Sequence, residues 1–222
     1  MEFIFMLTRE DRTIADCLEV YDSIRALPIQ HIGFKDTGVD QETMRRLHDR
    51  LRADDRTTYI EVVSTGADAC LRSAEAAAGL GVDRLLGGTQ VKEILGLLKG
   101  TKTGYYPFPG LPTGHPTKLG GSPQRIAADT RAALAAGCAG VDLLAYRATD
   151  ADPLDLIRAA RGATERTVIV AGNVDSPARI RAVADAGADL FTIGTAALAG
   201  SFDTRYGLLA NQLRRILEAC AA

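Results

Sequence analysis

Short apolar runs that alternate with helical segments are the feature of this sequence that most restricts its fold. Between the runs, apolar residues recur with helical spacing, as they do at Ile14, Cys17, Leu18, Tyr21 and Ile24. The runs themselves are too short for helices, and most are rich in Val, Ile, Leu, Tyr or Phe, which favours strands. They cover residues 3–7, 31–35, 59–63, 84–87, 104–107, 141–145, 168–171 and 190–193.

Strands that alternate with helices pair in parallel through right-handed crossovers. Eight such units in 222 residues predict an α/β fold, a compact (β/α)₈ TIM barrel. Apart from single polar or charged residues the runs are continuously apolar, as expected for strands buried on both faces. An open doubly wound sheet is the alternative, but no GxGxxG motif follows the first run. Because no linker or low-complexity tract interrupts the pattern, we predict a single domain over residues 1–222.

Charge and cysteine content give no sign of nucleic-acid or membrane binding and indicate a cytoplasmic protein. The formal net charge of −2 provides no electrostatic argument for nucleic acid or an anionic membrane as a partner. No apolar run approaches the roughly 18 residues of a membrane span, and the N-terminus lacks the features of a signal peptide. The four cysteines lie far apart without a CxxC pair, which indicates reduced thiols in a cytoplasmic protein. The oligomeric state stays open, and a homo-oligomer is among the assemblies considered.

Glycines follow the last two predicted strands. The seventh run leads into Gly172-Asn173, and the eighth leads into Gly194-Thr195. Active sites of TIM barrels lie at the carboxyl ends of the strands, and a phosphate often binds after strands seven and eight. Glycine lets a ligand approach the backbone closely, and a short helix starting near Thr195 would direct N–H groups at the same point. Tight turns alone are the simpler explanation for each glycine taken separately.

The passage AGNVDSPARIRAVADAGADLFTIGTAAL resembles the end of the ribulose-phosphate-binding barrel superfamily. That group includes isomerases of histidine and tryptophan synthesis, N-acetylmannosamine-6-phosphate epimerase and the ketogulonate-phosphate decarboxylases. The resemblance covers residues 167–200 and is architectural elsewhere. It implies a sugar phosphate held on backbone amides at Gly172, Asn173, Gly194 and Thr195. It does not define the reaction, because isomerases, lyases, synthases and some flavin enzymes share this phosphate site.

Two charged residues in predicted strands are the main candidates for catalysis. Lys35 ends the second strand, and Glu61 lies inside the third apolar run. Burying Glu61 alone would be costly, so Lys35 on the neighbouring strand is its natural partner. Such a pair suits acid–base work, and Lys35 could hold an enolate oxygen, donate a proton or form a Schiff base. A structural ion pair is the alternative.

Further candidates follow other strands. Arg147 and Tyr146 follow the sixth strand, where Arg147 could clamp an anion by its planar fork and Tyr146 could donate a proton. Arg9 follows the first strand and has a similar position. Residues 108–122 form a long connection rich in glycine and proline, so we expect an active-site lid that brings His115 to the substrate. For each of these residues a solvated surface role is the alternative.

An internal similarity suggests a second anion site. Residues 81–89 and 187–195 share a glycine, an aspartate two residues later and a final Gly-Thr, as a duplicated half-barrel would. By analogy with the strand-eight turn, Gly87, Gly88 and Thr89 could hold a second anion. Asp83 and Asp189 occur at strand starts, so we expect them to stabilise the fold instead of acting in catalysis.

These residues lead to three functional hypotheses. The first is a sugar-phosphate isomerase, epimerase or carbon–carbon lyase that acts on a small phosphorylated substrate and uses Lys35 and Glu61 for proton transfer, with no cofactor required. The second is a barrel enzyme with FMN in the same phosphate site. The third is a non-catalytic barrel that binds a phosphorylated metabolite. No zinc pattern is present in the sequence, and Mg²⁺ held by Asp36 and Glu61 stays open.

Overall fold

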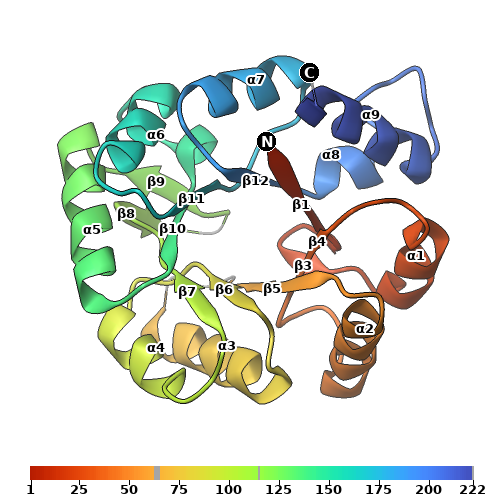
Figure 1. The fold of residues 1–222 in the computed structure, drawn as a ribbon, viewed down its shortest axis with the longest axis horizontal. Helices are drawn as coiled ribbons and strands as arrows, with labels where there is room; N and C mark the ends of the chain where they lie inside the picture. Colours follow the sequence, from red (N-terminus) through yellow and green to blue (C-terminus); the bar gives the residue numbers. More distant parts are fainter. Residues whose placement is uncertain (63–65, 115, 222) are drawn as a thin grey trace.

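Eight parallel strands form a barrel surrounded by helices (Figure 1), which confirms the predicted (β/α)₈ fold. The computed structural model describes residues 1–62, 66–114 and 116–221. In the sheet the strands follow the order β10–β11–β12–β1–β4–β5–β6–β7. Their bounds are β1 Glu2–Met6, β4 His31–Lys35, β5 Thr57–Glu61, β6 Arg84–Leu86, β7 Gly104–Tyr106, β10 Gly140–Leu143, β11 Thr167–Val170 and β12 Leu190–Ile193.

Every predicted strand is present, with ends displaced by at most two residues. The helices that follow the strands are α1 Cys17–Ile24, α2 Gln41–Ala53, α3 Ala67–Leu80, α4 Val91–Leu97, α5 Pro123–Ala136, α6 Pro153–Arg161, α7 Pro177–Asp185, α8 Thr195–Leu198 and α9 Leu209–Ala221, with the short 3₁₀ helix η1 at Ala145–Arg147. Local sequence explains several of their ends. Ser122 and Ser176 each accept a hydrogen bond from the backbone N–H three residues later, which is the usual N-cap arrangement before a proline at the first helical position.

Backbone hydrogen bonds between β7 and β10 bring the two edges of the sheet together. The N–H of Ala139 donates to the carbonyl of Tyr105 at 2.9 Å, and the N–H of Asp142 donates to the carbonyl of Pro107 at 3.0 Å. These two bonds pair groups that would otherwise be left at open edges. The barrel therefore has an enclosed interior, into which one face of every strand points.

Strand register identifies the residues that face this interior. Cα partners in neighbouring strands point to the same face, so Lys35, Glu61, Leu86 and Tyr106 form one inward row across β4, β5, β6 and β7. An apolar cluster fills much of the space, with Ile4, Met6, Tyr59, Leu86, Tyr106, Ile169 and Leu190 as its buried members. Towards the amino ends of the strands, the guanidinium of Arg84 lies 5.3 Å from the Tyr59 ring and 5.6 Å from the Tyr106 ring.

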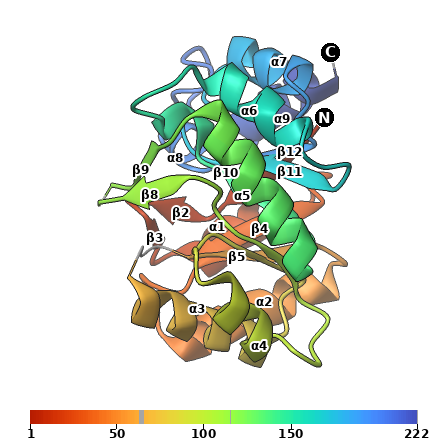
Figure 2. The ribbon, with the colours of Figure 1, turned by 90° about the vertical axis from the view of Figure 1, so that its left-hand side faces the viewer.

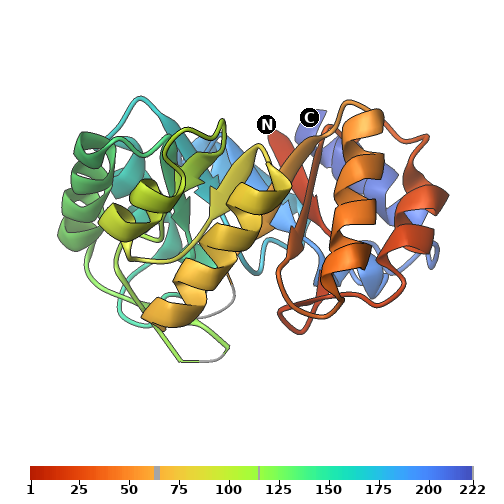
Figure 3. The ribbon, with the colours of Figure 1, turned by 90° about the horizontal axis from the view of Figure 1, so that it is seen from below.

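Two hairpins extend beyond the carboxyl ends of the strands. The first joins β2 (Thr8–Arg9) to β3 (Arg12–Thr13), and the second joins β8 (Leu111–Thr113) to β9 (Lys118–Gly120). Both lie on the side of the barrel away from the chain termini (Figures 2 and 3). The β8–β9 hairpin falls within residues 108–122, where the sequence predicted a lid. This hairpin is attached to the segment after β10, because the N–H of Thr149 donates to the carbonyl of Leu119 at 3.0 Å.

The two similar sequence segments occupy equivalent places. Asp83 accepts a hydrogen bond from the N–H of Thr58 at 2.8 Å, and Asp189 accepts one from the N–H of Val168 at 2.7 Å. Each carboxylate also pairs with an arginine of the helix before the neighbouring strand, Arg52 or Arg161. Both aspartates therefore hold the start of a strand, which is the structural role expected from the sequence.

No helix in the described part of the chain is both long and apolar enough to cross a lipid bilayer. All four cysteines are free thiols; Cys17, Cys70 and Cys138 are buried, and Cys220 is partly exposed.

We predict that Asp83→Ala and Asp189→Ala each lower the free energy of unfolding by about 1–3 kcal/mol, because each leaves a strand N–H without its acceptor. Equilibrium unfolding in urea measures the change. Glu75→Ala, at an exposed position of α3, is the control and should stay within about 0.5 kcal/mol of the wild type. Equal stability of all three variants and the wild type would contradict the role given to these aspartates.

Candidate active site

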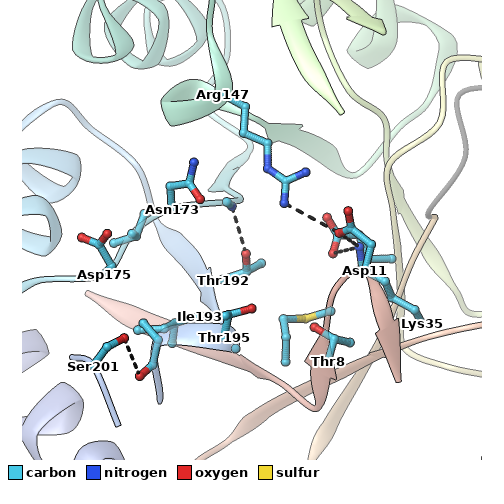
Figure 4. Close-up of a pocket in the computed structure, with 16 residues that line it drawn as sticks. Thr8, Asp11, Lys35, Arg147, Asn173, Asp175, Thr192, Ile193, Thr195 and Ser201 are labelled. Carbon is cyan, nitrogen blue, oxygen red and sulfur yellow. Dashed lines mark hydrogen bonds and ion pairs between the residues drawn. The ribbon is translucent and has the colours of Figure 1, made fainter. Parts of the chain in front are cut away.

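A cavity of about 250 Å³ opens at the carboxyl ends of the strands (Figure 4). Its walls come from both ends of the sequence, because the barrel brings β1 and β12 together. All four predicted phosphate-binding residues and three of the predicted catalytic residues lie in its wall. The lining residues are Met6, Thr8, Asp11, Lys35, Glu61, Arg147, Gly172, Asn173, Val174, Asp175, Thr192, Ile193, Gly194, Thr195, Ala196 and Ser201.

One wall consists of the turns after β11 and β12. Gly172 and Asn173 both have left-handed backbone conformations, with φ of +80° and +57°, and successive residues of unusual backbone conformation can present their N–H groups to an anion. The N–H of Gly172 lies 3.4 Å from the hydroxyl oxygen of Thr192. Helix α8 begins at Thr195 directly after Gly194, and the first N–H groups of a helix have no partner within it. We call this wall, formed by Gly172, Asn173, Gly194 and Thr195, the amide wall.

Packing explains both glycines of the amide wall. A Cβ at Gly194 would lie 2.8 Å from the carbonyl oxygen of Met6, so β1 and β12 can approach only without a side chain there. A Cβ at Gly172 would lie 2.6 Å from Nε of Arg147. The glycine after β11 therefore makes room for the arginine that follows β10. Close packing and access to the backbone amides are combined at the same two positions.

The opposite wall is a buried charge cluster around Lys35. Its ammonium Nζ lies 2.8 Å from an oxygen of Asp11 and 3.3 Å from an oxygen of Glu61, so the expected contact between Lys35 and Glu61 is present. Lys35 and Glu61 are 5% and 8% exposed. Burial alone would lower the pKa of Lys35, but the charges of Glu61 and Asp11 outweigh that effect and the pKa is raised. Lys35 is therefore an ammonium cation at neutral pH.

The β2–β3 hairpin positions Asp11 beside Lys35. Glu10 and Asp11 form its turn with φ of +50° and +57°, the left-handed pair that a two-residue hairpin turn requires. Thr13 attaches the hairpin to the end of β4. Its hydroxyl donates to the carbonyl of Lys35 at 2.7 Å and accepts from the N–H of Lys35 at 2.8 Å. The same residue that carries the ammonium thus anchors the hairpin that neutralises it.

Arg147 connects the two walls. Its side chain packs against Gly172, and its guanidinium lies 3.7 Å from an oxygen of Asp11. A dashed line in Figure 4 marks this ion pair. Another guanidinium nitrogen lies 3.5 Å from the carbonyl of Thr117 at the β8–β9 hairpin. The guanidinium is therefore placed beside the amide wall as well as beside the carboxylates.

Asp142 lies deeper, in β10, and is 0% exposed. Burial, followed by the negative charge of Glu61, raises its pKa well above the usual value for an aspartate. Lys35 and Arg147 act in the opposite direction and are outweighed. The interior beneath the cavity therefore contains a carboxyl group that tends to keep its proton.

The remaining predicted catalytic residues are placed outside this cavity or outside the described chain. The ring of Tyr146 packs beneath the guanidinium of Arg179 at 4.8 Å and is not part of the cavity wall. Arg9 is exposed on β2 and also lies outside the wall. His115 lies outside the described residues. The structure therefore brings Lys35, Glu61 and Arg147 together but leaves Tyr146 and Arg9 apart from them.

The segment proposed for a second anion is filled by protein atoms near its glycines. The N–H of Gly87 donates to the carbonyl of Tyr106 at 2.8 Å, so that amide already has a partner. A Cβ at Gly87 would lie 2.8 Å from the Phe108 ring, and one at Gly88 would lie 3.2 Å from Ile94. Thr89 lines a separate cavity between α4 and α5. The structure does not bring Gly87, Gly88 and Thr89 into the main cavity.

The carboxylates considered for Mg²⁺ have separate partners. Glu61 pairs with Lys35, whereas Asp36 accepts a hydrogen bond from the hydroxyl of Ser73 at 2.5 Å. Asp36 is not part of the cavity wall. Within residues 1–62, 66–114 and 116–221, no group of three or more His, Cys, Asp or Glu side chains is arranged to hold a metal ion.

The sequence reasoning missed Asp11 and Asp142. Asp142 interrupts the apolar run Gly-Val-Asp-Leu-Leu, which is the same signal that identified Glu61. Asp11 had a weaker signal: a Glu-Asp pair flanked by Thr-Arg and Arg-Thr can form a two-residue hairpin turn. Neither pattern alone predicts a contact with Lys35.

Comparison with known proteins identifies similar folds. No protein-family profile and no curated protein sequence matches this chain. A 3-hexulose-6-phosphate synthase, 19% identical, aligns with a TM-score of 0.64 over 97% of this chain and 99% of that chain. Orotidine 5′-phosphate decarboxylase from Pyrococcus horikoshii, 12% identical, aligns with a TM-score of 0.68 over 100% of both chains. Thiamine phosphate pyrophosphorylase from Pyrococcus furiosus, 14% identical, aligns with a TM-score of 0.61 over 100% of this chain and 97% of that chain.

These similar structures confirm the barrel fold of this chain and nothing finer. At identities below 20% they do not define the reaction, because one barrel supports many chemistries. The reaction of this chain depends on the residues that line its own cavity.

We predict that Thr13→Val lowers the free energy of unfolding by about 1–3 kcal/mol, because it leaves the buried backbone N–H and carbonyl of Lys35 without partners. Valine has nearly the same shape, so packing changes little. Urea unfolding measures stability, and faster hydrogen exchange at the Lys35 amide should accompany the loss. Thr204→Val, at an exposed position before α9, is the control. An unchanged exchange rate at Lys35 would contradict the anchoring role of Thr13.

Proposed function

We propose that this protein is an enzyme that acts on a small phosphorylated metabolite, and that it catalyses isomerisation, epimerisation or carbon–carbon cleavage through an enolate. One observation carries the proposal: a buried ammonium–carboxylate pair, Lys35 and Glu61, faces an amide-lined wall across a single cavity, and Arg147 lies between them. The two sides suit the two ends of a sugar phosphate.

The amide wall supports phosphate binding. Backbone N–H groups at a helix start and in left-handed turns attract anions, and the guanidinium of Arg147 adds a positive charge with planar, bidentate geometry. The similar structures include a hexulose-phosphate synthase, an orotidine-phosphate decarboxylase and a thiamine-phosphate pyrophosphorylase. Each of these enzymes is named after a phosphorylated compound, which agrees with a phosphate on this wall.

The charge cluster supports proton transfer at the other end of the substrate. In the proposed step, the Glu61 carboxylate accepts a proton from the carbon beside a substrate carbonyl. The electron pair moves onto the carbonyl oxygen, and the Lys35 ammonium stabilises that developing negative charge. Returning the proton to the other face of the same carbon gives epimerisation. Returning it to the neighbouring carbon gives isomerisation, provided that the hydroxyl proton on the first carbon moves to the former carbonyl oxygen. In cleavage, Glu61 instead accepts the proton of a β-hydroxyl group; that carbon becomes a carbonyl as its bond to the α-carbon breaks, the electron pair moves onto the oxygen beside Lys35, and the proton is returned to the α-carbon.

The raised pKa of Lys35 favours this role over a Schiff base. A Schiff base forms from a neutral amine, which a lowered lysine pKa would supply. Here Asp11 and Glu61 hold the ammonium in its charged form. An ammonium has three N–H donors, so two carboxylate contacts leave one N–H to approach a substrate oxygen. Lys35 therefore acts in the proposal as a cation and hydrogen-bond donor.

The charged wall opposite the amide wall argues against the FMN alternative, because an apolar surface would better match the planar ring of a flavin. A yellow purified protein would nevertheless support the FMN hypothesis. A non-catalytic barrel would be stabilised by phosphate esters without converting any of them. The buried acid–base pair is the reason that we prefer an enzyme.

We predict that the double variant Lys35→Gln/Glu61→Gln loses turnover by about 100-fold or more, because it removes the groups that move and stabilise the proton. Neutralising both partners leaves Asp11 beside Arg147 as a balanced pair, so neither of those buried charges is left alone. A screen of sugar phosphates provides the substrate, and thermal stabilisation by that substrate should persist in the variant. Lys99→Gln, at an exposed position after α4, is the control. Full turnover in the double variant would contradict the proposed mechanism.

We predict that Gly172→Ala weakens binding of inorganic phosphate by about 10-fold or more, because the new Cβ displaces Arg147 and distorts the amide wall; this corresponds to about 1.4 kcal/mol. Isothermal titration calorimetry measures the affinity. Gly81→Ala is a matched control, because Gly81 also has a left-handed backbone, with φ of +74°, but a Cβ there meets no atom within 4 Å. Equal affinities in both variants would argue against phosphate on this wall.

A further inference from the structure

Asp142 faces the interior of the barrel beneath the charge cluster. In the register of β10 and β11 its Cα partner is Ile169, a member of the interior cluster, and Cα partners point to the same face. Its electrostatic neighbours are Glu61, Lys35 and Arg147. Because β6 and β7 separate β5 from β10 in the sheet, Asp142 faces Glu61 across the interior and not along a strand pair.

The carboxyl group of Asp142 forms no ion pair or hydrogen bond with any side chain in the described ranges. Among the described residues, neither of its oxygens has a hydrogen-bond partner, and both are buried. An ionised carboxylate in such a place is very costly, and a buried acid usually avoids this cost by keeping its proton. The structure therefore favours the neutral acid at this position.

Among the described residues, the charged side chains around Asp142 are balanced without it. Two cations, Lys35 and Arg147, face two carboxylates, Asp11 and Glu61. An ionised Asp142 would add a third negative charge. Arg84, another cation of the interior, lies over the Tyr59 and Tyr106 rings towards the amino ends of the strands and is not among the charges that act on Asp142. Its neighbouring strands contribute the phenol of Tyr106 from β7 and the uncharged residues of β11, Thr167–Val170.

We propose that Asp142 is a further functional residue of this site: a buried carboxylic acid that keeps its proton and so leaves Glu61 as the ionised carboxylate of the pair. Two carboxyl groups that face each other in a dry site do not both ionise readily. Asp142 is then a positioning residue that acts through Glu61 and does not touch the substrate.

The consequence for catalysis rests on the proposed function, whereas the protonation of Asp142 does not. If Glu61 is the base, ionisation of Asp142 at alkaline pH disturbs the charge balance that keeps Lys35 and Glu61 paired. We expect kcat/KM to fall on the alkaline side and this fall to be reduced in Asp142→Asn, whose side chain resembles the neutral acid. Any decrease of kcat/KM at alkaline pH that remains in Asp142→Asn comes from the titration of other groups.

Stability as a function of pH tests the protonation without a substrate. An aspartate with a raised pKa binds more protons in the folded than in the unfolded chain, so stability decreases as pH rises above its usual value of about 3.9. An asparagine at position 142 does not titrate, so the variant does not lose stability in this way as the pH rises. The urea midpoint of Asp142→Asn should therefore rise relative to that of the wild type as pH increases from about 4 to 8, and the relative shift should disappear at the acidic end.

Asp203→Asn is the control of opposite sign. Hydrogen bonds from Arg205 lower the pKa of Asp203, so its stabilising contribution is present above the usual pKa and is lost as the pH falls. Asp203→Asn should consequently be less stable than the wild type at neutral pH and approach it in acid. If Asp142→Asn follows the same direction as this control, Asp142 is ionised and the proposal is overturned.

Infrared difference spectroscopy provides a direct test. At neutral pH the wild type should show the carbonyl stretch of a protonated carboxyl group, and Asp142→Asn should lack it. If the variant does not fold, isotope labelling of the aspartate carboxyls in the wild type should shift the same band. A spectrum that contains only aspartate carboxylate bands would overturn the proposal. Failure to find a substrate would affect the proposed function but would leave these two measurements decisive for Asp142.

Discussion

Closure of the sheet between β7 and β10 is the constraint on which the site depends. Two backbone hydrogen bonds complete the ring, and a closed parallel ring directs the carboxyl ends of all its strands to one side. The last residues of β4 and β5 and the segments that follow β1, β10, β11 and β12 consequently meet in one cavity. Without closure, β10 and its Asp142 would not face Glu61 across an interior.

The enclosed interior imposes a second requirement, which is neutralisation of charge. Lys35 is buried, and burial of a lone ammonium would be unfavourable. Carboxylates from two other elements, Asp11 and Glu61, offset its charge, and Arg147 adds a cation beside Asp11. The β2–β3 hairpin exists in this position because Thr13 attaches it to the backbone of Lys35. The hairpin is thus part of the electrostatic arrangement of the site.

The strands and half of the site followed from local patterns. Apolar runs predicted all eight barrel strands. Because Glu61 lies inside such a run, we could also predict that its buried carboxylate would pair with the Lys35 ammonium. The same reasoning could have found Asp142, since it also interrupts an apolar run. Asp11 was harder to predict from the sequence, because it reaches Lys35 only when the β2–β3 hairpin turns back over β4. Tyr146 follows the same strand as Arg147, yet its ring packs against Arg179 outside the cavity, and sequence spacing could not distinguish the two directions.

The sequence by itself determined the order of strands and helices, because apolar periodicity and capping residues act within a few neighbouring positions. It also indicated that the turns after β11 and β12 need glycine. Only the tertiary structure decided why: Gly172 makes room for Arg147, and Gly194 makes room for the backbone of β1. It likewise decided which charges meet, since Asp11, Lys35, Glu61, Asp142 and Arg147 come from five separate segments. Their contacts depend on ring closure and close packing, which no local pattern encodes.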